Sequence, residues 1–292
     1  MKAGAIDRSE LAEFLASVVA PECISYCAAK VGASADAILK RIQTYAGEVP
    51  IALSLLDGVS LANRRALDVG AGIGLTSFFL HRSGFDVTAL EPGGIGFEIN
   101  HTLFFALRDH LDCSEVSLLS FGAEVLDPER NGRFDIIFSA NVLEHVSDLE
   151  AVVGALARVL SADGVMVHTC PNYTVPYEPH YRMPLLPFAP AATPWARGRK
   201  AEDLWRSFNF VTAGELERLM QRAGLKPVFA KGIMAQAFER VLLDQGFAGR
   251  HSPAMASVAK FLKATGGLNL LRRWPPQFAT PLVVMATKIA SN

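Results

Sequence analysis

The spacing of hydrophobic residues changes near residue 65. Before it, apolar positions recur at helical intervals, which predicts amphipathic helices across residues 7–65. After it, short apolar runs alternate with stretches of helical spacing. The runs that predict strands are 66–69, 86–90, 116–121, 134–140, 164–169, 228–230 and 282–287, and the helices expected among them are 75–81, 99–111, 149–160 and 212–223.

The predicted strands are almost continuously apolar, and helices separate most of them. In a sheet with one solvent-exposed face, polar and apolar residues would alternate along each strand. The pattern therefore predicts an α/β fold with a doubly wound, mostly parallel sheet that helices cover on both faces. We expect an N-terminal helical annex in residues 1–60 and one main domain in residues 61–292. That domain should contain a loop insertion at 171–210 and a helical insertion at about 234–279.

A proline-rich segment interrupts the pattern. Seven of the 16 prolines and three of the five tyrosines lie between Pro171 and Pro194. Proline fixes φ and removes a backbone donor, so neither a regular helix nor a central strand is expected there. Long loops in compact domains often serve a site. The aromatic residues around His180 favour a wall or lid over one.

Composition and targeting signals narrow the class of protein. Of the 292 residues, 50% are hydrophobic and 20% charged, which is typical of soluble globular proteins. The four cysteines form no motif of a zinc ribbon or a disulfide framework. Asp7, Glu10 and Glu13 distinguish the N-terminal stretch from a secretory signal, and no uncharged run approaches the ~20 residues that span a bilayer. We therefore expect a cytoplasmic protein without a transmembrane segment.

The formal net charge of −1 hides two oppositely charged regions. Residues 1–179 carry 12 Lys and Arg against 23 Asp and Glu, whereas residues 180–292 carry 16 against 6. Either the two regions attract each other, or the basic region selects a small anionic acceptor. Nucleic acid is disfavoured because the whole chain is nearly neutral. The basic residues concerned are Arg197, Arg199, Lys200, Arg206, Lys260, Lys263, Arg272 and Arg273.

The strongest motif is LDVGAGIG (67–74) at a predicted strand-to-helix junction, followed by Glu91 after the next strand. Glycines allow a sharp turn and close approach of a ligand. An acidic side chain at the end of the second strand accepts hydrogen bonds from ribose hydroxyls. The motif therefore predicts a nucleoside site. Leu75 replaces the third glycine of the dinucleotide fingerprint. Asp68 would repel a pyrophosphate but attract an ammonium group, which favours S-adenosylmethionine (SAM) over NAD.

Four blocks in this order resemble the class I SAM-dependent methyltransferases over roughly residues 60–230. They are LDVGAGIG, ALEPG, FDIIFSANVLEHVSD and LARVLSADGVMVHTCPN. The resemblance implies a seven-stranded sheet. It also implies that Asp68 and the glycine loop hold the methionine part of SAM and that Glu91 holds the ribose.

The same resemblance places the adenine at the turn after the third strand. Many relatives carry an acid where this chain has Gly122, so we expect the backbone of Ala123 to serve, with Glu124 nearby. Open parallel sheets bind ligands at the carboxyl ends of their strands, which adds Ser139 and Asn141. The residues expected to contact SAM are Asp68, Gly70, Ala71, Gly72, Glu91, Pro92, Ala123, Glu124, Ser139 and Asn141.

Transfer of a methyl group from a sulfonium depends mainly on orientation, but a hydroxyl acceptor benefits from a proton acceptor. Histidine suits that role near neutral pH. His180, in the proline-rich loop, is the preferred catalytic candidate, and His145, just past the fourth predicted strand, is the second. The competing interpretation of His145 is a local hydrogen bond.

A divalent metal is the alternative for the same residues. Small-RNA 2′-O-methyltransferases and certain quinone-pathway O-methyltransferases of this fold hold a metal with Glu-x-x-Glu-His. Here Asn141 replaces the first acid, which leaves Glu144 and His145, with His180 as a further ligand. Because losing a carboxylate weakens a site for hard cations, no metal is predicted.

We therefore predict a SAM-dependent methyltransferase that acts on a small molecule, by O-methylation of an anionic or sugar-type acceptor. Two rivals remain. One is an NAD-dependent oxidoreductase, which would use the same glycine loop. The other is a non-catalytic SAM-binding partner of another subunit, which the lack of an unambiguous base keeps open.

Overall fold

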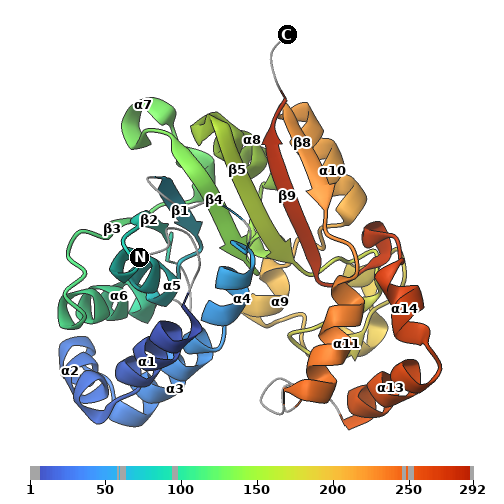
Figure 1. Ribbon diagram of the computed structural model, residues 1–292, viewed down its shortest axis with the longest axis horizontal. Coiled ribbons are helices and arrows are strands. Elements are labelled where there is room, and N and C mark those ends of the chain that lie inside the picture. The colour runs from blue at the N-terminus through green and yellow to red at the C-terminus, as the bar shows by residue number, and fades with distance from the viewer. Residues whose placement is uncertain are drawn as a thin grey trace. The chain divides into compact units, whose positions relative to one another are not determined.

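The computed structural model describes residues 7–57, 59, 64–93, 98–244, 248 and 253–289. Four helices come first: α1 (Arg8–Val18), α2 (Pro21–Val31), α3 (Ala35–Ala46) and α4 (Val49–Ser54) (Figure 1). Side-chain caps start two of them, because Asp7 accepts a hydrogen bond from the backbone N–H of Ser9 and Ser34 accepts one from Ala37. The helical spacing of the N-terminal sequence is confirmed.

Seven strands form one sheet in the order β3-β2-β1-β4-β5-β9-β8. They are β1 (Arg65–Val69), β2 (Asp86–Leu90), β3 (Ser117–Leu119), β4 (Phe134–Ala140), β5 (Leu160–Cys170), β8 (Leu225–Phe229) and β9 (Leu282–Lys288). Strand β1 pairs in parallel with β2 and with β4, and β2 pairs in parallel with β3. The predicted mostly parallel, seven-stranded α/β sheet is confirmed.

Helices and short turns connect the strands. They are α5 (Leu75–Arg82), α6 (Glu98–His110), η1 (Ala123–Val125), α7 (Pro128–Asn131), η2 (Leu143–His145) and α8 (Leu149–Val159), where η denotes a 3₁₀ turn. Helix α5 packs on β2, and α6 packs on α2. Side chains such as Leu67 on β1 and Phe138 on β4 are fully buried. The continuous apolar runs therefore form the core, as a sheet covered on both faces requires.

Strand β3 is shorter than the predicted strand at 116–121. It lies at the edge of the sheet, and its printed register with β2 covers three residue pairs. The N–H of Val116 bonds to the carbonyl of Cys113 in a turn at 3.0 Å instead of joining the ladder. An apolar run alone does not reveal where such a turn ends and the strand begins.

The proline-rich segment contains more structure than its prolines predicted. Strands β6 (Tyr177–Glu178) and β7 (Met183–Pro184) pair antiparallel and form a separate small sheet. Two 3₁₀ turns, η3 (Pro190–Ala192) and η4 (Pro194–Ala196), and the short helix α9 (Asp203–Ser207) follow. No regular helix or central strand occurs in the segment 171–194, as the prolines required.

Helix α10 (Ala213–Arg222) begins where the sequence predicted, since the Thr212 side chain accepts the Glu215 N–H at 3.2 Å. Helices α11 (Ile233–Leu243), α13 (Pro253–Ala264) and α14 (Gly267–Arg272) come after β8, and η5 (Pro276–Phe278) precedes β9. The three helices α11, α13 and α14 pack on one another (Figure 1).

The chain divides into two compact units. The first consists of Met1–Val142, Asp148–Val167 and Thr287–Asn292, and the second consists of Leu143–Ser147 and His168–Ala286. Among the described residues, no single helix is long and apolar enough to cross a bilayer; α1 and α2 meet the length and composition test only as a pair bent by 52°.

Candidate functional site

In the first unit, the glycine loop follows β1 directly. Gly70 and Gly72 have φ values of 72° and 59°, which side-chain-bearing residues rarely adopt. A Cβ on Gly70 would collide with Val142, and a Cβ on Gly72 would collide with the ring of Tyr45. Both glycines are therefore required by conformation and by space.

Asp68, on β1 just before this loop, is 5% exposed. Its carboxylate accepts a hydrogen bond from the Ser77 hydroxyl of α5 at 2.7 Å. Burial raises the pKa of Asp68 to about 7, the Ser77 bond opposes that rise, and the nearby Glu91 adds to it. A cation placed here would favour the ionised carboxylate.

Glu91 follows β2 and ties two loops together. One carboxylate oxygen accepts the Gly72 N–H at 2.8 Å, and the other accepts the Gly93 N–H at 3.3 Å. The His101 ring nitrogen Nε2 lies 2.7 Å from the Glu91 carbonyl oxygen, so it donates there. Burial raises the pKa of Glu91 despite these bonds. The predicted ribose-binding acid thus lies against the glycine loop.

The N-terminal helices contribute side chains that the sequence did not reveal as part of a site. Tyr45 of α3 lies over Gly72, and its hydroxyl accepts a hydrogen bond from the Asn100 amide at 2.7 Å. The Asn100 carbonyl in turn accepts from Arg41 at 2.7 Å. Their helical spacing is that of ordinary packing residues, so no sequence signal could have identified them.

The end of β4 meets the same helices. Asn141, with a φ of 56°, donates from its side-chain amide to the Glu48 carboxylate at 3.2 Å. Ser139, two residues earlier, is completely buried. Pro92, which comes directly after Glu91, is exposed. These predicted SAM contacts therefore belong to the first unit, at the carboxyl ends of β2 and β4.

The turn after β3 forms η1. Ala123 is buried, and Glu124 is exposed. The Glu124 carboxylate folds back over the backbone of Gly122, where a Cβ on that glycine would meet it. An acidic group therefore does lie at this turn, supplied from two residues further along than in the relatives.

The second unit holds both candidate histidines. His180 Nδ1 lies 2.6 Å from a carboxylate oxygen of Glu178, and the same oxygen accepts the His180 backbone N–H at 2.7 Å. Glu178 is completely buried, and its other oxygen accepts a bond from the Tyr173 hydroxyl at 3.3 Å. The Glu178 carboxylate therefore fixes the orientation of the His180 imidazole.

His145, on η2, lies beside His180. The ring centroids are 5.5 Å apart, and the side chains are 27% and 28% exposed, so a substrate can reach both. Burial, together with the neighbouring His180, lowers the pKa of His145 to about 4. His145 is therefore neutral at pH 7. Its Nδ1 pairs with the Ser207 hydroxyl at 2.7 Å, which is the local bond that the competing interpretation expected.

Glu144 completes a cluster with the two histidines. Its side chain is fully buried, 3.9 Å from His145 Nε2. One ligand atom from each of Glu144, His145 and His180 lies within 4.8 Å of the others. These are the residues that the metal alternative named, and they can hold an ion.

An aromatic core supports this cluster. Tyr173, Leu185, Ala196, Trp205 and Phe208 are buried together, and the Phe208 ring lies 5.2 Å from both histidine rings. The buried partners that position the site, Glu178 on β6 among them, were not predicted. The proline-rich loop therefore forms a packed wall beside the histidines.

Asn209 holds η2 against this wall. Its amide donates to the carbonyls of Leu143 and Val146 at 2.6 and 2.9 Å, and its backbone N–H donates to the carbonyl of Glu144. A single side chain thus fixes the turn that carries His145. No pattern in the sequence indicates this role, because asparagine is common in loops.

Comparison with known proteins identifies the family. Residues 39–229 match the family model of a methyltransferase domain. A Mycobacterium tuberculosis protein named "Uncharacterized protein Rv1509" is 32% identical over 204 residues, which are 66% of this chain and 68% of the relative. The ubiquinone biosynthesis O-methyltransferase of Marinobacter nauticus is 32% identical over 118 residues, or 40% of this chain and 48% of that enzyme.

A solved structure agrees on the fold. Geranyl diphosphate C-methyltransferase from Streptomyces coelicolor A3(2) superimposes with a TM-score of 0.52 over 99% of this chain and 90% of its own, at 15% sequence identity. At that identity the likeness concerns the fold alone. The matched domain covers most of the predicted sheet and its glycine loop, which excludes the oxidoreductase alternative. The chain belongs to the methyltransferase domain family and is a SAM-dependent methyltransferase of the class I fold.

Proposed function

We propose that SAM lies along the carboxyl ends of β1, β2 and β4 in the first unit. Asp68 would pair with its ammonium group, Glu91 would accept its ribose hydroxyls, and Glu124 would accept from the adenine amino group. The raised pKa of Asp68 supports this role, since a buried carboxylate gains most from a bound cation. Gly70, Ala71 and Gly72 would bring the backbone close to the methionine part.

The reaction that fits the second unit best is methyl transfer to an oxygen of a small acceptor. One observation carries this proposal: buried Glu178 holds the His180 imidazole at 2.6 Å, beside a second histidine and within reach of an acceptor. His180 would accept the proton of the acceptor hydroxyl while that oxygen attacks the methyl carbon of SAM. S-adenosylhomocysteine (SAH) leaves, and Glu178 stabilises the imidazolium that forms. The O-methyltransferase of Marinobacter nauticus is consistent with an oxygen acceptor.

Two variants test the role of His180. Replacement of His180 by Ala should lower kcat by about 10²- to 10⁴-fold, the usual contribution of a general base, while the Kd of SAM is unchanged. Glu178→Gln should lower kcat less and shift its pH profile, because the imidazolium loses its partner. His110→Ala, on an exposed helix end, is the control. Unchanged turnover in His180→Ala would contradict the proposal.

The acceptor is proposed to be anionic, such as a phosphorylated sugar or nucleotide-linked sugar. Arg197, Lys200 and Arg206 lie in or just after the proline-rich loop and, in the part of the chain that the structure describes, take part in no ion pair. Arg199, in contrast, is engaged by Glu202 at 2.9 Å. A screen with labelled methyl donor should therefore find transfer to phosphorylated acceptors and little to their uncharged counterparts. Equal transfer to both would refute this substrate class.

A divalent metal is the second candidate, favoured by the 4.8 Å cluster of Glu144, His145 and His180. Two imidazoles and a carboxylate suit Zn²⁺, Mn²⁺ or Fe²⁺ better than Mg²⁺. A metal there would polarise the acceptor oxygen. Glu178 would then orient His180 as a ligand, as carboxylates commonly do for metal-binding histidines. The amide of Asn141, which stands where the first acid would be, donates to Glu48.

Chelation separates the two candidates. If His180 is a base, dialysis against a chelator leaves kcat unchanged. If the cluster holds a metal, chelation abolishes turnover, one added divalent ion restores it, and elemental analysis of the untreated protein finds about one ion per chain. Activity in any acceptor assay also distinguishes an enzyme from a non-catalytic partner. A cytoplasmic location stays a prediction, in keeping with four buried cysteines without a disulfide.

A further inference from the structure

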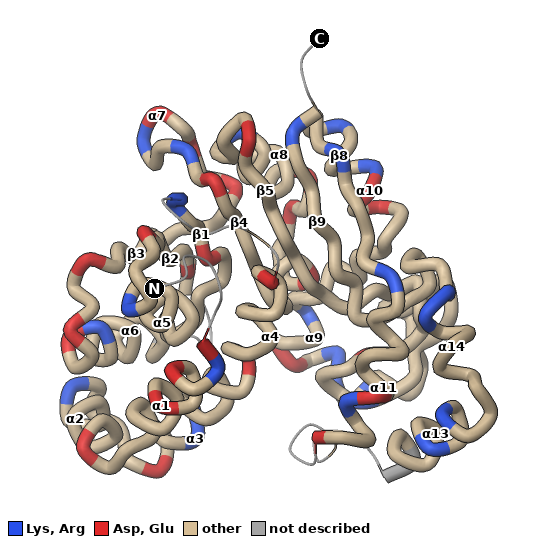
Figure 2. Tube along the Cα trace, in the orientation of Figure 1, with Lys and Arg blue, Asp and Glu red and all other residues tan. Residues whose placement is uncertain are grey.

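The helices after β8 extend beyond the matched methyltransferase domain, which ends at residue 229. The last acidic residue of the whole chain is Asp244, and residues 245–292 contain six Lys or Arg and no Asp or Glu. Helices α13 and α14 lie in this stretch. Figure 2 shows basic positions along both helices and no acidic one.

These two helices expose large apolar side chains. Phe261 is 65% exposed and Val258 is 45% exposed on α13, and Leu270 is 64% exposed on α14. Val258 and Phe261 are three residues apart and therefore face the same side of α13. The buried Ala259 and Leu268 show that each helix has a separate inward face. The exposed apolar side chains therefore do not contribute to the hydrophobic core.

Cations accompany these apolar residues. Lys260, Lys263 and Arg273 take part in no ion pair within the described ranges 7–57, 59, 64–93, 98–244, 248 and 253–289. We define the α13–α14 surface by five residues: Val258, Lys260, Phe261, Leu270 and Arg273.

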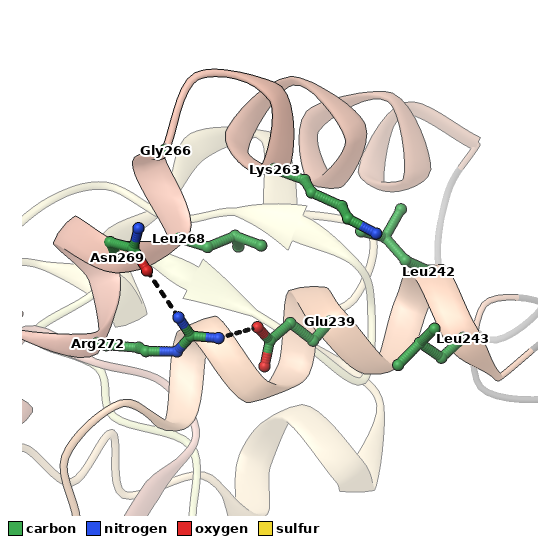
Figure 3. Close-up of a pocket in the computed structure, with 8 residues that line it drawn as sticks. All are labelled: Glu239, Leu242, Leu243, Lys263, Gly266, Leu268, Asn269 and Arg272. Atoms are coloured by element: carbon green, nitrogen blue, oxygen red, sulfur yellow. Dashed lines mark hydrogen bonds and ion pairs between the residues drawn. The ribbon is translucent and has the colours of Figure 1, made fainter.

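Arg272 is not counted in this surface. Its guanidinium donates to Asn269 at 2.7 Å and pairs with Glu239 of α11 (Figure 3). A cavity of about 300 Å³ lies among the three helices, and its lining includes Leu242, Leu268 and Lys263. Lys263 faces this cavity, so it is not counted in the surface either, and Glu239 in the same lining disfavours an anion there (Figure 3). The exposed outer surface is the stronger candidate for an interaction.

We propose that the α13–α14 surface docks on an anionic lipid bilayer. Aromatic and aliphatic side chains of a surface helix enter the boundary between headgroups and acyl chains, and Lys or Arg beside them bind headgroup phosphates. Phe261, Val258 and Leu270 supply the first element, and Lys260 and Arg273 supply the second. The lack of any acid on both helices gives the surface the charge sign that an anionic leaflet attracts.

Other occupants fit less well. In a symmetric contact with a second copy, the same patch meets itself, and its cations without a partner would repel. A nucleic acid would gain from the cations and from stacking on Phe261, but exposed Val258 and Leu270 offer it neither stacking nor hydrogen bonds. A bilayer binds the apolar residues and the basic residues of the surface at the same time. The fold supports this use, because α11 and α14 hold α13 in place without covering its outer side chains.

Vesicle sedimentation tests the proposal with the full chain. The protein should bind vesicles that mix phosphatidylcholine with phosphatidylglycerol, bind phosphatidylcholine alone far more weakly, and dissociate as salt is raised. The double variant Lys260→Gln, Arg273→Gln should weaken partitioning about 25-fold, since each basic residue at an anionic surface contributes about fivefold. Phe261→Ser with Leu270→Ser should weaken it further at high salt, where only apolar insertion remains.

A matched control removes the same charge elsewhere in the second unit. Arg218→Gln, Lys226→Gln neutralises two exposed cations outside the surface and should change binding less than about twofold. Circular dichroism and the Kd of SAH verify that every variant is folded. Equal losses in both double variants, or no vesicle binding by the folded wild-type chain, would overturn the proposal. So would self-association or oligonucleotide binding that depends on the five residues while vesicles are ignored.

Discussion

Burial makes two carboxylates of the first unit, those of Asp68 and Glu91, costly to ionise. Each has a raised pKa from burial, and the charge of Glu91 adds to the shift at Asp68. The folded pKa of Asp68 is about 7, against 3.8 as its ordinary value. Between those values the native state holds a proton that the unfolded state has lost, so stability falls as pH rises through this interval. A bound ammonium group would relieve that loss.

This linkage gives a prediction for the ligand-free protein. Its free energy of unfolding should fall with pH between about 4 and 7, by at most about 1.4 kcal/mol per unit from this one group. Asp68→Asn should remove that part of the slope, because the amide does not titrate. Denaturant unfolding at a series of pH values measures both slopes. Identical slopes in the two proteins would show that Asp68 is ionised in the folded state throughout the range.

Glu124 supplies a second prediction at this scale. Its carboxylate covers Gly122 at the turn proposed to hold the adenine. Glu124→Ala should weaken SAH binding by about 1–2 kcal/mol, the loss of a hydrogen bond to a charged acceptor. Glu129→Ala, an exposed acid of α7, is the control. Analogues in which inosine replaces adenosine sharpen the test, because they lack the amino group. Their affinities for the wild type and for Glu124→Ala should therefore differ little. Unaltered SAH affinity would remove Glu124 from the site.

The residues nearest the motifs could be predicted from the sequence, and those that position them could not. Asp68 and Glu91 are close in sequence to the glycine loop. Because β1 and β2 pair in parallel, their carboxyl ends bring both residues to the same end of the sheet. Glu178 differs because its role depends on a two-residue strand and on the hydroxyl of Tyr173. An acid between a tyrosine and a proline looks like an ordinary loop residue. The sequence named His180 as a candidate without revealing the carboxylate that holds it.

At the scale of elements, the N-terminal helices contribute more than packing. Helix α3 places Tyr45 over the glycine loop, and the turn before α4 brings Glu48 to Asn141. The sequence predicted the helices from their spacing but not this contact, because the spacing of apolar residues describes a helix's own faces and not its neighbours. Helices α3 and α4 therefore form one wall of the proposed cofactor site.

The Tyr45 contact can be tested by filling the space at Gly72. Gly72→Ala should destabilise the protein by more than the ~1 kcal/mol cost of the left-handed backbone, because the new methyl group meets the Tyr45 ring. It should also weaken SAH binding. Adding Tyr45→Ala should recover part of both losses, whereas Gly84→Ala, also at positive φ but without a neighbour, shows the backbone cost alone. Thermal unfolding and calorimetry measure the effects; additive losses in the double variant would exclude the contact.

At the scale of the whole molecule, the sheet and the C-terminal helices differ in how far the sequence determined them. Alternating apolar strands and helices leave few topologies for a parallel sheet, so the fold class followed from local patterns. The helices α11, α13 and α14 bury part of their apolar residues and expose Phe261 and Leu270. Periodicity marks such residues as core, and only the structure shows that they face outward.

The structure also shows where the basic residues of the second sequence region lie. Much of the basic excess beyond residue 180 lies in the proline-rich loop and on α13 and α14, where acids are few or absent (Figure 2). The two proposals divide it accordingly: Arg197, Lys200 and Arg206 for an anionic acceptor, and the α13–α14 surface for a bilayer. The interpretation in which the two regions merely neutralise each other predicts neither activity.

Calorimetric titration with SAM tests the central claim most directly, because it asks whether Asp68 meets a cationic ligand. Only the ionised carboxylate should pair with the ammonium group, so the affinity of the wild-type protein should rise about tenfold from about pH 5.5 to about pH 7.0. Asp68→Asn should bind weakly and without that pH dependence. Absence of SAM binding, or a variant with wild-type affinity and the same pH slope, would contradict the account.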